Sequence, residues 1–308
     1  MKIAFLFSGQ GTQYPGMMKD LYDAVPAAKY VFDAADKALG RSISELCFNG
    51  SQEELNLTHN TQPCMLAADI AAAAALHTHG VKPEAVAGFS LGEYGALAFA
   101  NAISIDEIFR IIQIRADAMQ AAVPPGDGAM AAFIGAAPEQ IEDICNKVTK
   151  GYVVAANYNS PVQTVVSGAT AGVDEACMIA AELNLRCVKL AVSAPFHCAL
   201  MEPAAKKLEK EFKRIHFQNP TIPVYMNVEG KPVVDGDILA DLLVKQAISP
   251  VRWVQTLENM YADGIDTFVE CGTGKTLSGL VRKTLKGVKV LRVENVKTLQ
   301  KTLEELMA

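Results

Sequence analysis

A serine stands between paired glycines in the pentapeptide GFSLG at 88–92. The apolar run Ala85 to Phe89 precedes Ser90 and a helical run follows it, so the pentapeptide falls at a strand-to-helix junction. Glycines two residues before and after a serine allow the tight turn that exposes its Oγ at the end of a sheet. Amides at the start of the next helix point at whatever binds there. Ser90 is therefore a candidate nucleophile; the alternative is a turn in which Ser90 only caps the helix.

A serine nucleophile needs a general base, because its free hydroxyl is scarcely ionised at neutral pH. Four of the five histidines lie in polar stretches typical of a protein surface. His197 instead follows the last strand of a predicted insert, where the chain returns to a larger unit and can face Ser90; alternatively, it only begins a helix. No acidic residue between Ser90 and His197 stands where a hydrolase carries its third member. Either a backbone carbonyl orients the imidazole or Ser90 is not a hydrolase serine.

Two further side chains fit the chemistry of acyl transfer. Gln10, within SGQGTQ at 8–13, ends the first predicted strand, where its amide and nearby N–H groups can hold an oxyanion. Arg115 lies in a predicted helix over 108–120 that is apolar on its inner side. Burying a guanidinium there is costly unless it meets an anion, and its planar fork matches a carboxylate. The alternative for Arg115 is a side chain that reaches out to solvent. The NTQP segment at 60–63 is expected to cap the following helix.

The elements that must position these side chains follow two orders along the chain. Residues 1–123 and 197–308 alternate strands and helices, which is typical of a parallel α/β sheet. The segment between them has the order βαββαβ of a ferredoxin-like unit. We predict an α/β fold, with an α/β-hydrolase-like parallel-sheet domain over 1–123 and 197–308 and an inserted ferredoxin-like subdomain over 124–196. A ligand is expected in the cleft between the two.

Composition narrows the class of protein. The 308 residues carry a formal net charge of −6, which argues against a broad basic face for nucleic acid. The longest apolar stretch, Met65 to Leu76, contains Asp69 and is shorter than the ~20 residues of a membrane span. The seven cysteines are scattered without a CxxC, which favours reduced thiols and a cytoplasmic protein. Neither cysteines nor histidines have the spacing of metal ligands, so no metal is expected.

Motifs along nearly the whole chain resemble those of the malonyl-CoA:acyl carrier protein transacylases, the acyltransferase family of fatty acid synthesis. The matching segments keep their order and spacing: SGQGTQ at 8–13, NTQP at 60–63, GFSLGEY at 88–94, VPPGDGAM at 123–130, ANYNSPVQTVVSG at 156–168, SAPFHCALM at 193–201, SPVRW at 249–253 and ECGTGKTLSGL at 270–280. A match of this extent is far more specific than the pentapeptide alone.

The resemblance implies a ping-pong transfer of malonyl from malonyl-CoA to the phosphopantetheine thiol of acyl carrier protein. It implies that Ser90 is the nucleophile and that His197 acts first as base and then as acid. Arg115 would hold the malonyl carboxylate, and Gln10 with the Leu91 N–H would form the oxyanion hole. A main-chain carbonyl in the segment 249–253 would orient the histidine. Coenzyme A is then part of the substrate malonyl-CoA, and no bound cofactor is expected.

Two aromatic residues, one directly before the candidate nucleophile and one directly before the candidate base, can be compared with the family pattern. The residue before the nucleophile is usually histidine, and here it is Phe89. Loss of a hydrogen bond beside Ser90 would alter the rate or the choice of acyl group without removing the Ser–His pair. Phe196, before the base, resembles the malonyl-selective members. Together with Met119, both aromatic residues are expected to line the acyl pocket.

Several other functions share parts of this pattern. A free-standing acyltransferase of a polyketide synthase has every motif, whereas an acyl hydrolase would lose Arg115. A non-catalytic binding subunit would lose Ser90, His197 or Gln10.

The expected partner is an acidic carrier protein, docked by Arg282, Lys283 and Lys286, and the chain is expected to be a monomer. A second basic row, on the helix near 201–215, is expected to be a solvated face.

Overall fold

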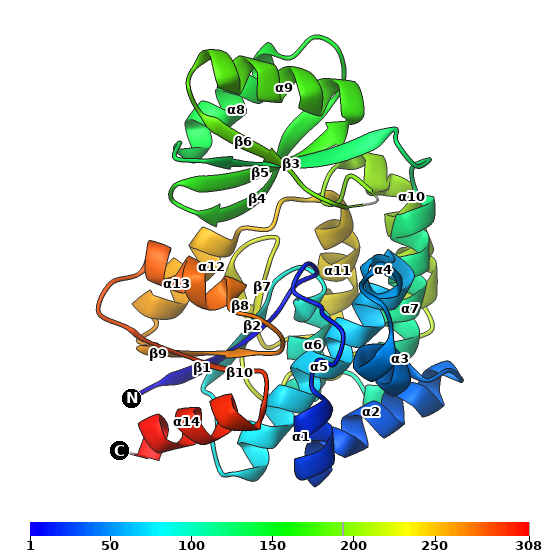
Figure 1. The fold of residues 1–308 in the computed structure, drawn as a ribbon, viewed down its shortest axis with the longest axis vertical. Coiled ribbons are helices and arrows are strands. Elements are labelled where there is room, and N and C mark those ends of the chain that lie inside the picture. Colours follow the sequence, from blue (N-terminus) through cyan, green and yellow to red (C-terminus); the bar gives the residue numbers. More distant parts are fainter. Residues whose placement is uncertain (193, 308) are drawn as a thin grey trace.

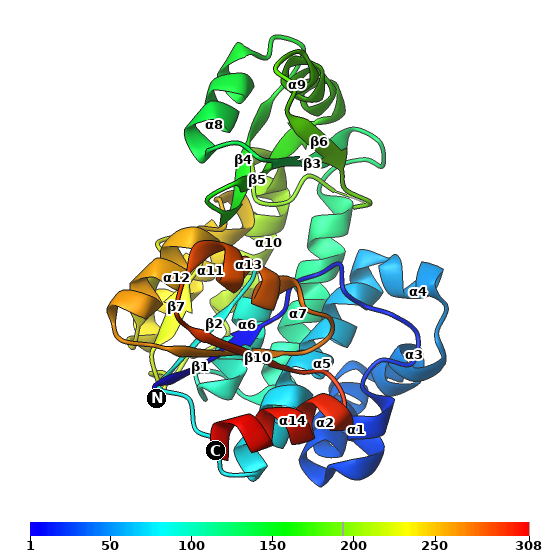
Figure 2. The same cartoon turned by 60° about the vertical axis from the view of Figure 1, so that its left-hand side comes forward.

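A computed structural model describes residues 1–192 and 194–307, which form two units, each built on its own sheet (Figures 1 and 2). The larger unit, in the lower part of Figure 1, combines the N-terminal and C-terminal segments of the chain. The smaller unit, drawn in green above it, comes from the middle of the sequence. Ser193, part of the SAPFHCALM motif that joins the two, lies outside the described residues.

The larger sheet has the strand order β10-β9-β1-β2-β7-β8. All neighbouring pairs are parallel except β7 with the short strand β8. The strands are β1 (Ile3–Phe7), β2 (Ala85–Gly88), β7 (Val224–Met226), β8 (Lys231–Val233), β9 (Thr267–Cys271) and β10 (Lys289–Val293). Because β1 and β2 lie at the centre and are buried on both faces, both are continuous apolar runs.

Alternate side chains of β1 enter two different cores, since successive residues of a strand point to opposite faces. Phe5 and Phe7 join the core shared with α5 (Thr58–Thr78) and α7 (Ile105–Ala121). Ala4 and Leu6 join a second core with α12 (Trp253–Ala262) and α13 (Thr276–Thr284). Helix α6 (Gly92–Phe99) follows β2 directly. The remaining helices are α1 (Lys19–Ala24), α2 (Pro26–Leu39), α3 (Ile43–Asn49), α4 (Gln52–Asn56), α10 (Glu202–Phe212), α11 (Leu239–Ile248) and α14 (Val296–Met307).

The smaller sheet is antiparallel, with strand order β4-β5-β3-β6. Its elements are β3 (Gly128–Ile134), α8 (Pro138–Lys147), β4 (Val153–Ser160), β5 (Gln163–Ala169), α9 (Thr170–Glu182) and β6 (Arg186–Lys189). The predicted βαββαβ order is therefore confirmed. Ala131 and Phe133 face the core under α8 and α9, whereas Met130 and Ala132 face the larger unit. The division at residues 123 and 197 stays a prediction about independent folding units.

Two local expectations are wrong. The NTQP segment does not cap α5, because the helix already begins at Thr58 and carries Asn60 to Pro63 within it. Nor are all seven cysteines free: Cys177 on α9 and Cys187 on β6 form a disulfide, and the other five are free thiols. Packing of α9 against β6 brings the two Cα atoms to 5.7 Å, within the span of a disulfide.

The apolar stretch from Met65 to Leu76 forms most of the buried part of α5. Among the described residues, no helix has both the length and the apolar character needed to cross a bilayer.

Candidate active site

Ser90 occupies the sharp turn between β2 and α6, with a φ of 55°. The turn demands its flanking glycines for steric reasons. A Cβ on Gly88 would lie 1.9 Å from the Gly92 carbonyl carbon, and one on Gly92 would lie 2.3 Å from the Phe7 oxygen. The first residue before the helix is Leu91, and no side chain caps it, so a purely capping role for Ser90 is ruled out.

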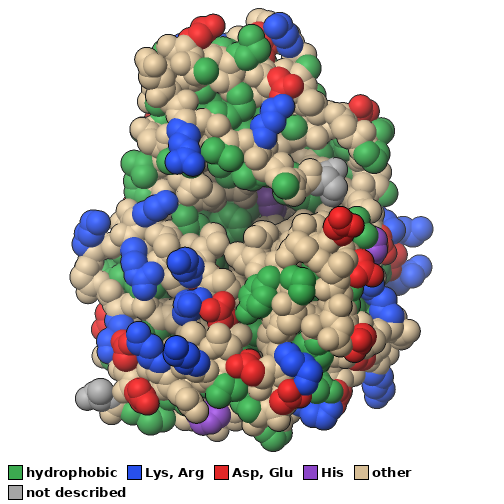
Figure 3. Space-filling model, viewed as in Figure 1, with side chains coloured by type: hydrophobic (Ala, Val, Ile, Leu, Met, Phe, Trp, Pro, Cys, Tyr) green, Lys and Arg blue, Asp and Glu red, His purple; other side chains and the backbone are tan. Residues whose placement is uncertain are grey.

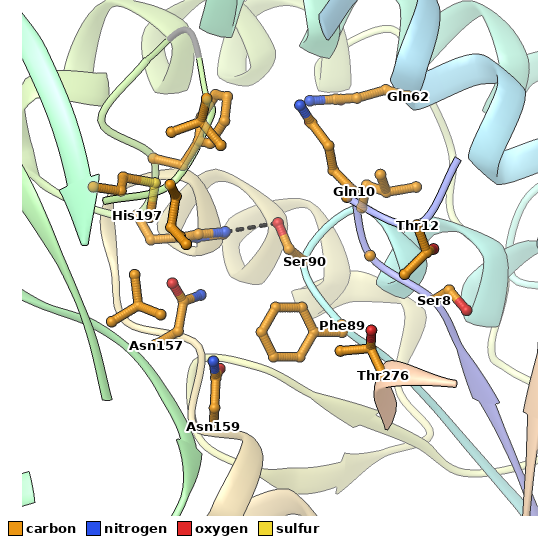
Figure 4. A pocket seen from close by; sticks show the side chains of 18 of the residues that line it. Ser8, Gln10, Thr12, Gln62, Phe89, Ser90, Asn157, Asn159, His197 and Thr276 are labelled. Carbon is orange, nitrogen blue, oxygen red and sulfur yellow. Dashed lines mark hydrogen bonds between the residues drawn. The ribbon is translucent and has the colours of Figure 1, made fainter. Parts of the chain in front are cut away.

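His197 meets Ser90 across this turn, and its Nε2 lies 2.6 Å from the Ser90 Oγ (Figure 4). Its Nδ1 lies 2.9 Å from the main-chain oxygen of Gln246. A backbone carbonyl therefore orients the imidazole, which was one of the two alternatives that the sequence left open. The principal acceptor is Gln246 at the end of α11, three residues before the predicted segment 249–253, from which the Ser249 backbone adds a weaker interaction. His197 also has a left-handed φ, of 59°.

Burial, together with the positive charge of Arg115, lowers the pKa of His197 from 6.5 to about 4. The carbonyl acceptors at Gln246 and Ser249 oppose this shift, because they favour the protonated ring. The imidazole is consequently neutral at neutral pH. A neutral ring held against a serine hydroxyl is ready to accept its proton.

Arg115 projects from α7 to the same point and is buried, so it does not reach out to solvent. Its Nη1 donates to Gln62 Oε1 at 2.8 Å, and its Nη2 donates to Gln246 Oε1 at 3.1 Å and to Ser90 Oγ at 3.2 Å. The guanidinium also lies 5.2 Å from the ring centre of Tyr94. Its acceptors are neutral, and no carboxylate lies within ion-pair distance in the described parts of the chain.

The buried positive charge of Arg115 therefore has no negatively charged partner within ion-pair distance among the described residues. Glu93 is buried nearby, but burial raises its pKa to about 8 against the opposing effects of Asn227, Gln246 and Arg115. It is mostly protonated at neutral pH and neutralises Arg115 poorly. Burial raises the pKa of Tyr94 to about 12, so the phenol is neutral too. A ligand with a carboxylate beside its reacting carbonyl would satisfy Arg115 next to Ser90.

Gln10 and Leu91 line the same cavity as Ser90 and His197. The Gln10 Nε2 lies 3.5 Å from Thr58 Oγ1, a long hydrogen bond that leaves the amide loosely held. Leu91 contributes the first N–H after the nucleophile, at the start of α6. Both residues therefore border the cavity that Ser90 and His197 line.

The cavity holds about 220 Å³ and opens between the two sheets (Figures 3 and 4). Figure 3 shows a hollow between the upper and lower units with a histidine side chain inside it. The predicted pocket residues Phe89, Phe196 and Met119 all line it, and Phe89 packs edge-on against Trp253 with ring centres 5.3 Å apart. The smaller unit and its return segment add Met130, Asn157, Asn159, Val165, Leu190, Ala191 and Val192.

Arg282, Lys283 and Lys286 do not line the cavity. They are exposed at the end of α13 and just after it, and the first turn of this helix, with Thr276 and Leu277, forms part of the cavity wall. Lys and Arg side chains gather on this flank of the opening in Figure 3. By contrast, the basic row on α10 is paired with its own acids through Lys206–Glu202, Lys213–Glu209 and Arg214–Glu211.

Three buried amides of the site escape sequence reasoning. Gln62 and Gln246 hold Arg115. Asn227, which directly follows β7, accepts from the Ser90 N–H at 2.8 Å and donates to the Gly88 oxygen at 2.6 Å. One pattern in the sequence could have indicated them: a single amide side chain in a mostly apolar helix, as in LLVKQAI at 242–248, or at the end of a strand. Within the described residues, no group of three or more His, Cys, Asp or Glu side chains is arranged to hold a metal ion.

Known proteins share this sequence and architecture. The family model described as "Acyl transferase domain" matches residues 4–307. A malonyl CoA-acyl carrier protein transacylase of Bacillus subtilis is 41% identical over 308 residues, covering 99% of this chain and 97% of the relative.

Solved structures agree with this match. The crystal structure of a malonyl CoA-acyl carrier protein transacylase from Clostridium perfringens superposes with a TM-score of 0.96 at 42% identity, covering 100% of this chain and 98% of the other. A malonyl-transacylase in complex with a type II PKS acyl-carrier protein has a TM-score of 0.96 at 37% identity, covering 99% of this chain and 100% of the other.

Proposed function

The chain belongs to the acyl transferase domain family, and we propose that it transfers malonyl from malonyl-CoA to the phosphopantetheine thiol of acyl carrier protein. The observation that carries this proposal is the position of Arg115. Its buried guanidinium, held by two neutral amides, lies 3.2 Å from the Ser90 Oγ. A malonyl thioester has a carboxylate that can bind the guanidinium and, at its other end, a reactive carbonyl that the neighbouring Ser90 Oγ can attack.

The first half of the reaction forms an ester on Ser90. The Ser90 Oγ attacks the thioester carbonyl carbon while His197 Nε2 takes the hydroxyl proton. The tetrahedral intermediate collapses with loss of the coenzyme A sulfur, which receives that proton from His197. In the second half, His197 takes the proton of the carrier thiol, whose sulfur attacks the malonyl ester. The Ser90 oxygen then leaves and regains a proton from the same imidazole.

Negative charge develops on the carbonyl oxygen in both tetrahedral intermediates. We assign its stabilisation to the Leu91 N–H and the Gln10 amide, which border the cavity beside Ser90. The loose contact of Gln10 with Thr58 is readily exchanged for a bond to the oxyanion. Arg115 stays on the carboxylate throughout, so the acyl group keeps one orientation while the two thiols exchange.

Intact-protein mass spectrometry tests the acyl-enzyme. Mixing the protein with malonyl-CoA should add the mass of one malonyl group, located on Ser90 by peptide mapping. The Ser90→Ala variant should show no such addition. If the wild-type protein neither gains a malonyl group nor releases coenzyme A from malonyl-CoA, the proposed function is wrong.

The preference for malonyl should depend on Arg115. Arg115→Ala should lower kcat/KM for malonyl-CoA by roughly 100- to 1,000-fold, since it removes the partner of a buried carboxylate. The slower reaction with acetyl-CoA, which has no carboxylate, should change little. Equal losses with both substrates would contradict a carboxylate-binding role.

We propose further that acyl carrier protein docks beside α13, on Arg282, Lys283 and Lys286. Support comes from their exposure next to the cavity mouth and from the lack of an acidic partner for any of them within the described residues. An acidic carrier would meet this flank despite the overall charge of −6. We place the reaction in the cytoplasm, where it would supply fatty acid synthesis.

Charge reversal tests the docking site. The double variant R282E/K283E should raise KM for carrier protein by roughly tenfold, equivalent to ~1.4 kcal/mol of binding free energy. Acylation by malonyl-CoA alone should keep its wild-type rate. The matched control K206E/K207E places the same change on α10 and should affect neither step. A carrier KM that responds equally to both double variants would place docking elsewhere.

The second candidate is a trans-acting acyltransferase of a polyketide synthase. It is favoured by the similarity to the malonyl-transacylase that binds a type II PKS acyl-carrier protein. Transfer rates to a fatty-acid carrier and to a polyketide carrier, measured side by side, separate the two candidates.

A further inference from the structure

Gln246 touches three different parts of the candidate active site, although only one contact involves its main chain. It lies in the last turn of α11 and is buried. Its carbonyl oxygen holds His197, its Oε1 accepts from Arg115, and its Nε2 donates to the main-chain oxygen of Ser90 at 2.8 Å. The hydrogen bond from Gln246 Nε2 to the Ser90 oxygen has no role in the acyl-transfer steps described above.

The Ser90 oxygen belongs to the same peptide group as the Leu91 N–H. The described chain contains no cis peptide bond, and in a trans peptide the C=O and N–H point in opposite directions. Gln246 Nε2 and the Glu93 N–H, at 3.2 Å, both donate to this oxygen. Fixing the oxygen on one side therefore directs the Leu91 N–H to the other side, where Leu91 borders the cavity.

The orientation of the Gln246 amide is itself determined by Arg115. A guanidinium only donates hydrogen bonds, so the amide oxygen must face it and the NH₂ group must face the Ser90 carbonyl. Donation to that carbonyl also polarises the peptide and strengthens its N–H as a donor. One neutral side chain thus joins the carboxylate-binding arginine to the peptide of the proposed oxyanion hole.

We propose that the Gln246 side chain is a positioning residue that directs the Leu91 N–H at the thioester oxygen. This inference rests on the proposed function, in which that oxygen becomes an oxyanion. It implies that Gln246 promotes acylation for any acyl group, whereas the carboxylate-binding role of Arg115 concerns malonyl alone. Removal of the side chain should therefore slow the chemical step without changing the preference between acyl groups to the extent that Arg115→Ala does.

The test compares Gln246→Met with the wild-type protein in single-turnover release of coenzyme A from malonyl-CoA and acetyl-CoA. Methionine has a similar length and leaves the main-chain bond to His197 in place. The acylation rate should fall by roughly 10- to 100-fold with both substrates, below or near the effect of removing an oxyanion donor. KM for malonyl-CoA should rise by only a few-fold, because Arg115 loses one of its two amide acceptors but keeps Gln62. The acid limb of the pH–rate profile should not move.

The control is Lys245→Met, which makes a similar change one residue earlier on the exposed side of α11 and should leave both rates unchanged. Three results would overturn the inference: wild-type rates in Gln246→Met, a loss confined to malonyl-CoA, or a shifted acid limb, which would mean that α11 and its carbonyl had moved. Failure of the wild-type protein to form the malonyl ester would instead overturn the proposed function itself.

Gln246→Glu provides a second variant of nearly unchanged volume. Its carboxylate loses the donor to the Ser90 oxygen, so acylation should slow with both substrates. It also competes with malonyl for Arg115, so KM for malonyl-CoA should rise while that for acetyl-CoA does not. An acetyl-CoA acylation rate equal to wild type in this variant would contradict the positioning role.

Discussion

At the scale of single residues, the base is held by a main-chain carbonyl where many serine enzymes use a carboxylate. A neutral carbonyl fixes the tautomer of His197 but contributes no negative charge to raise its pKa. Burial and the positive charge of Arg115 therefore lower that pKa to about 4, because no carboxylate beside the ring opposes them. The imidazole remains a base over a wide range of pH.

The pH dependence of acylation follows from this shift. Because a lowered pKa keeps the ring neutral to lower pH, the rate with acetyl-CoA should be flat through neutrality and fall only as pH approaches about 4. Arg115→Ala removes a nearby positive charge, so its acid limb should lie at higher pH. Stopped-flow release of coenzyme A measures both profiles. A wild-type limb near 6.5, the ordinary value for histidine, would contradict the structure.

The sequence predicts the reactive side chains better than the side chains that hold them. Ser90, His197 and Arg115 stand out because a nucleophile in a glycine turn, a histidine at a junction and an arginine on an apolar face each have a chemical signature. Gln246 has none, since an amide is uncharged and its contact with Arg115 joins residues 131 positions apart. Only the folded chain places that amide next to a guanidinium.

At the scale of elements, the turn after β2 depends on the absence of side chains at its two glycines. The Asn227 side chain holds the two sides of this turn together, because it donates a hydrogen bond to the Gly88 oxygen and accepts one from the Ser90 N–H. The turn can therefore hold Ser90 at a φ that non-glycine residues rarely adopt. Strain of this kind is kept only where the surroundings enforce it.

Gly88→Ala should consequently destabilise the whole fold. The added methyl group would overlap the backbone of Gly92, which has no flexible side chain to move aside, and the cost should be about 3 kcal/mol or more. Gly279→Ala is the matched control, because no atom lies within 4 Å of its added Cβ and it sits within α13. It should be neutral or stabilising by up to ~1 kcal/mol. Urea denaturation measures both, and similar midpoints would refute this account.

The sequence predicts element types well where a helix has one apolar face, as in α7, and where strands and helices follow a distinctive order, as in the smaller unit. The start of α5 was misplaced because Asn, Thr and Pro are typical of helix caps, whereas Asn60 and Thr61 here bond backbone oxygens of the preceding turn. Tertiary packing of the whole first turn overrode those local preferences.

At the scale of the whole molecule, the chain enters and leaves the smaller unit at one point. A Cβ on Gly128, the first residue of β3, would lie 2.4 Å from the Pro195 ring. Pro195 precedes His197 by two residues, so the crossing of the two connections helps to place the base. The position of the smaller unit is thereby linked to the geometry of the Ser90–His197 pair.

Gly128→Ala should displace Pro195 and, with it, His197. We expect acylation of Ser90 to slow by roughly tenfold or more, as small misplacements of catalytic groups do, while the protein still unfolds in a single cooperative transition. Coenzyme A release and thermal unfolding measure the two effects, with Gly279→Ala again as the control. Undiminished acylation would show that the crossing does not position the base.

The strand order of the larger sheet also has a consequence for synthesis of the chain. β1 and β2 form its centre, yet their outer neighbours β9 and β7 come from the last third of the sequence. While the ribosome is still adding the intervening residues, the central pair has two unpaired, apolar edges that invite association with other chains. The nascent protein therefore depends on protection of those edges until translation is nearly finished, and shortened chains that end before β9 should accumulate as aggregates.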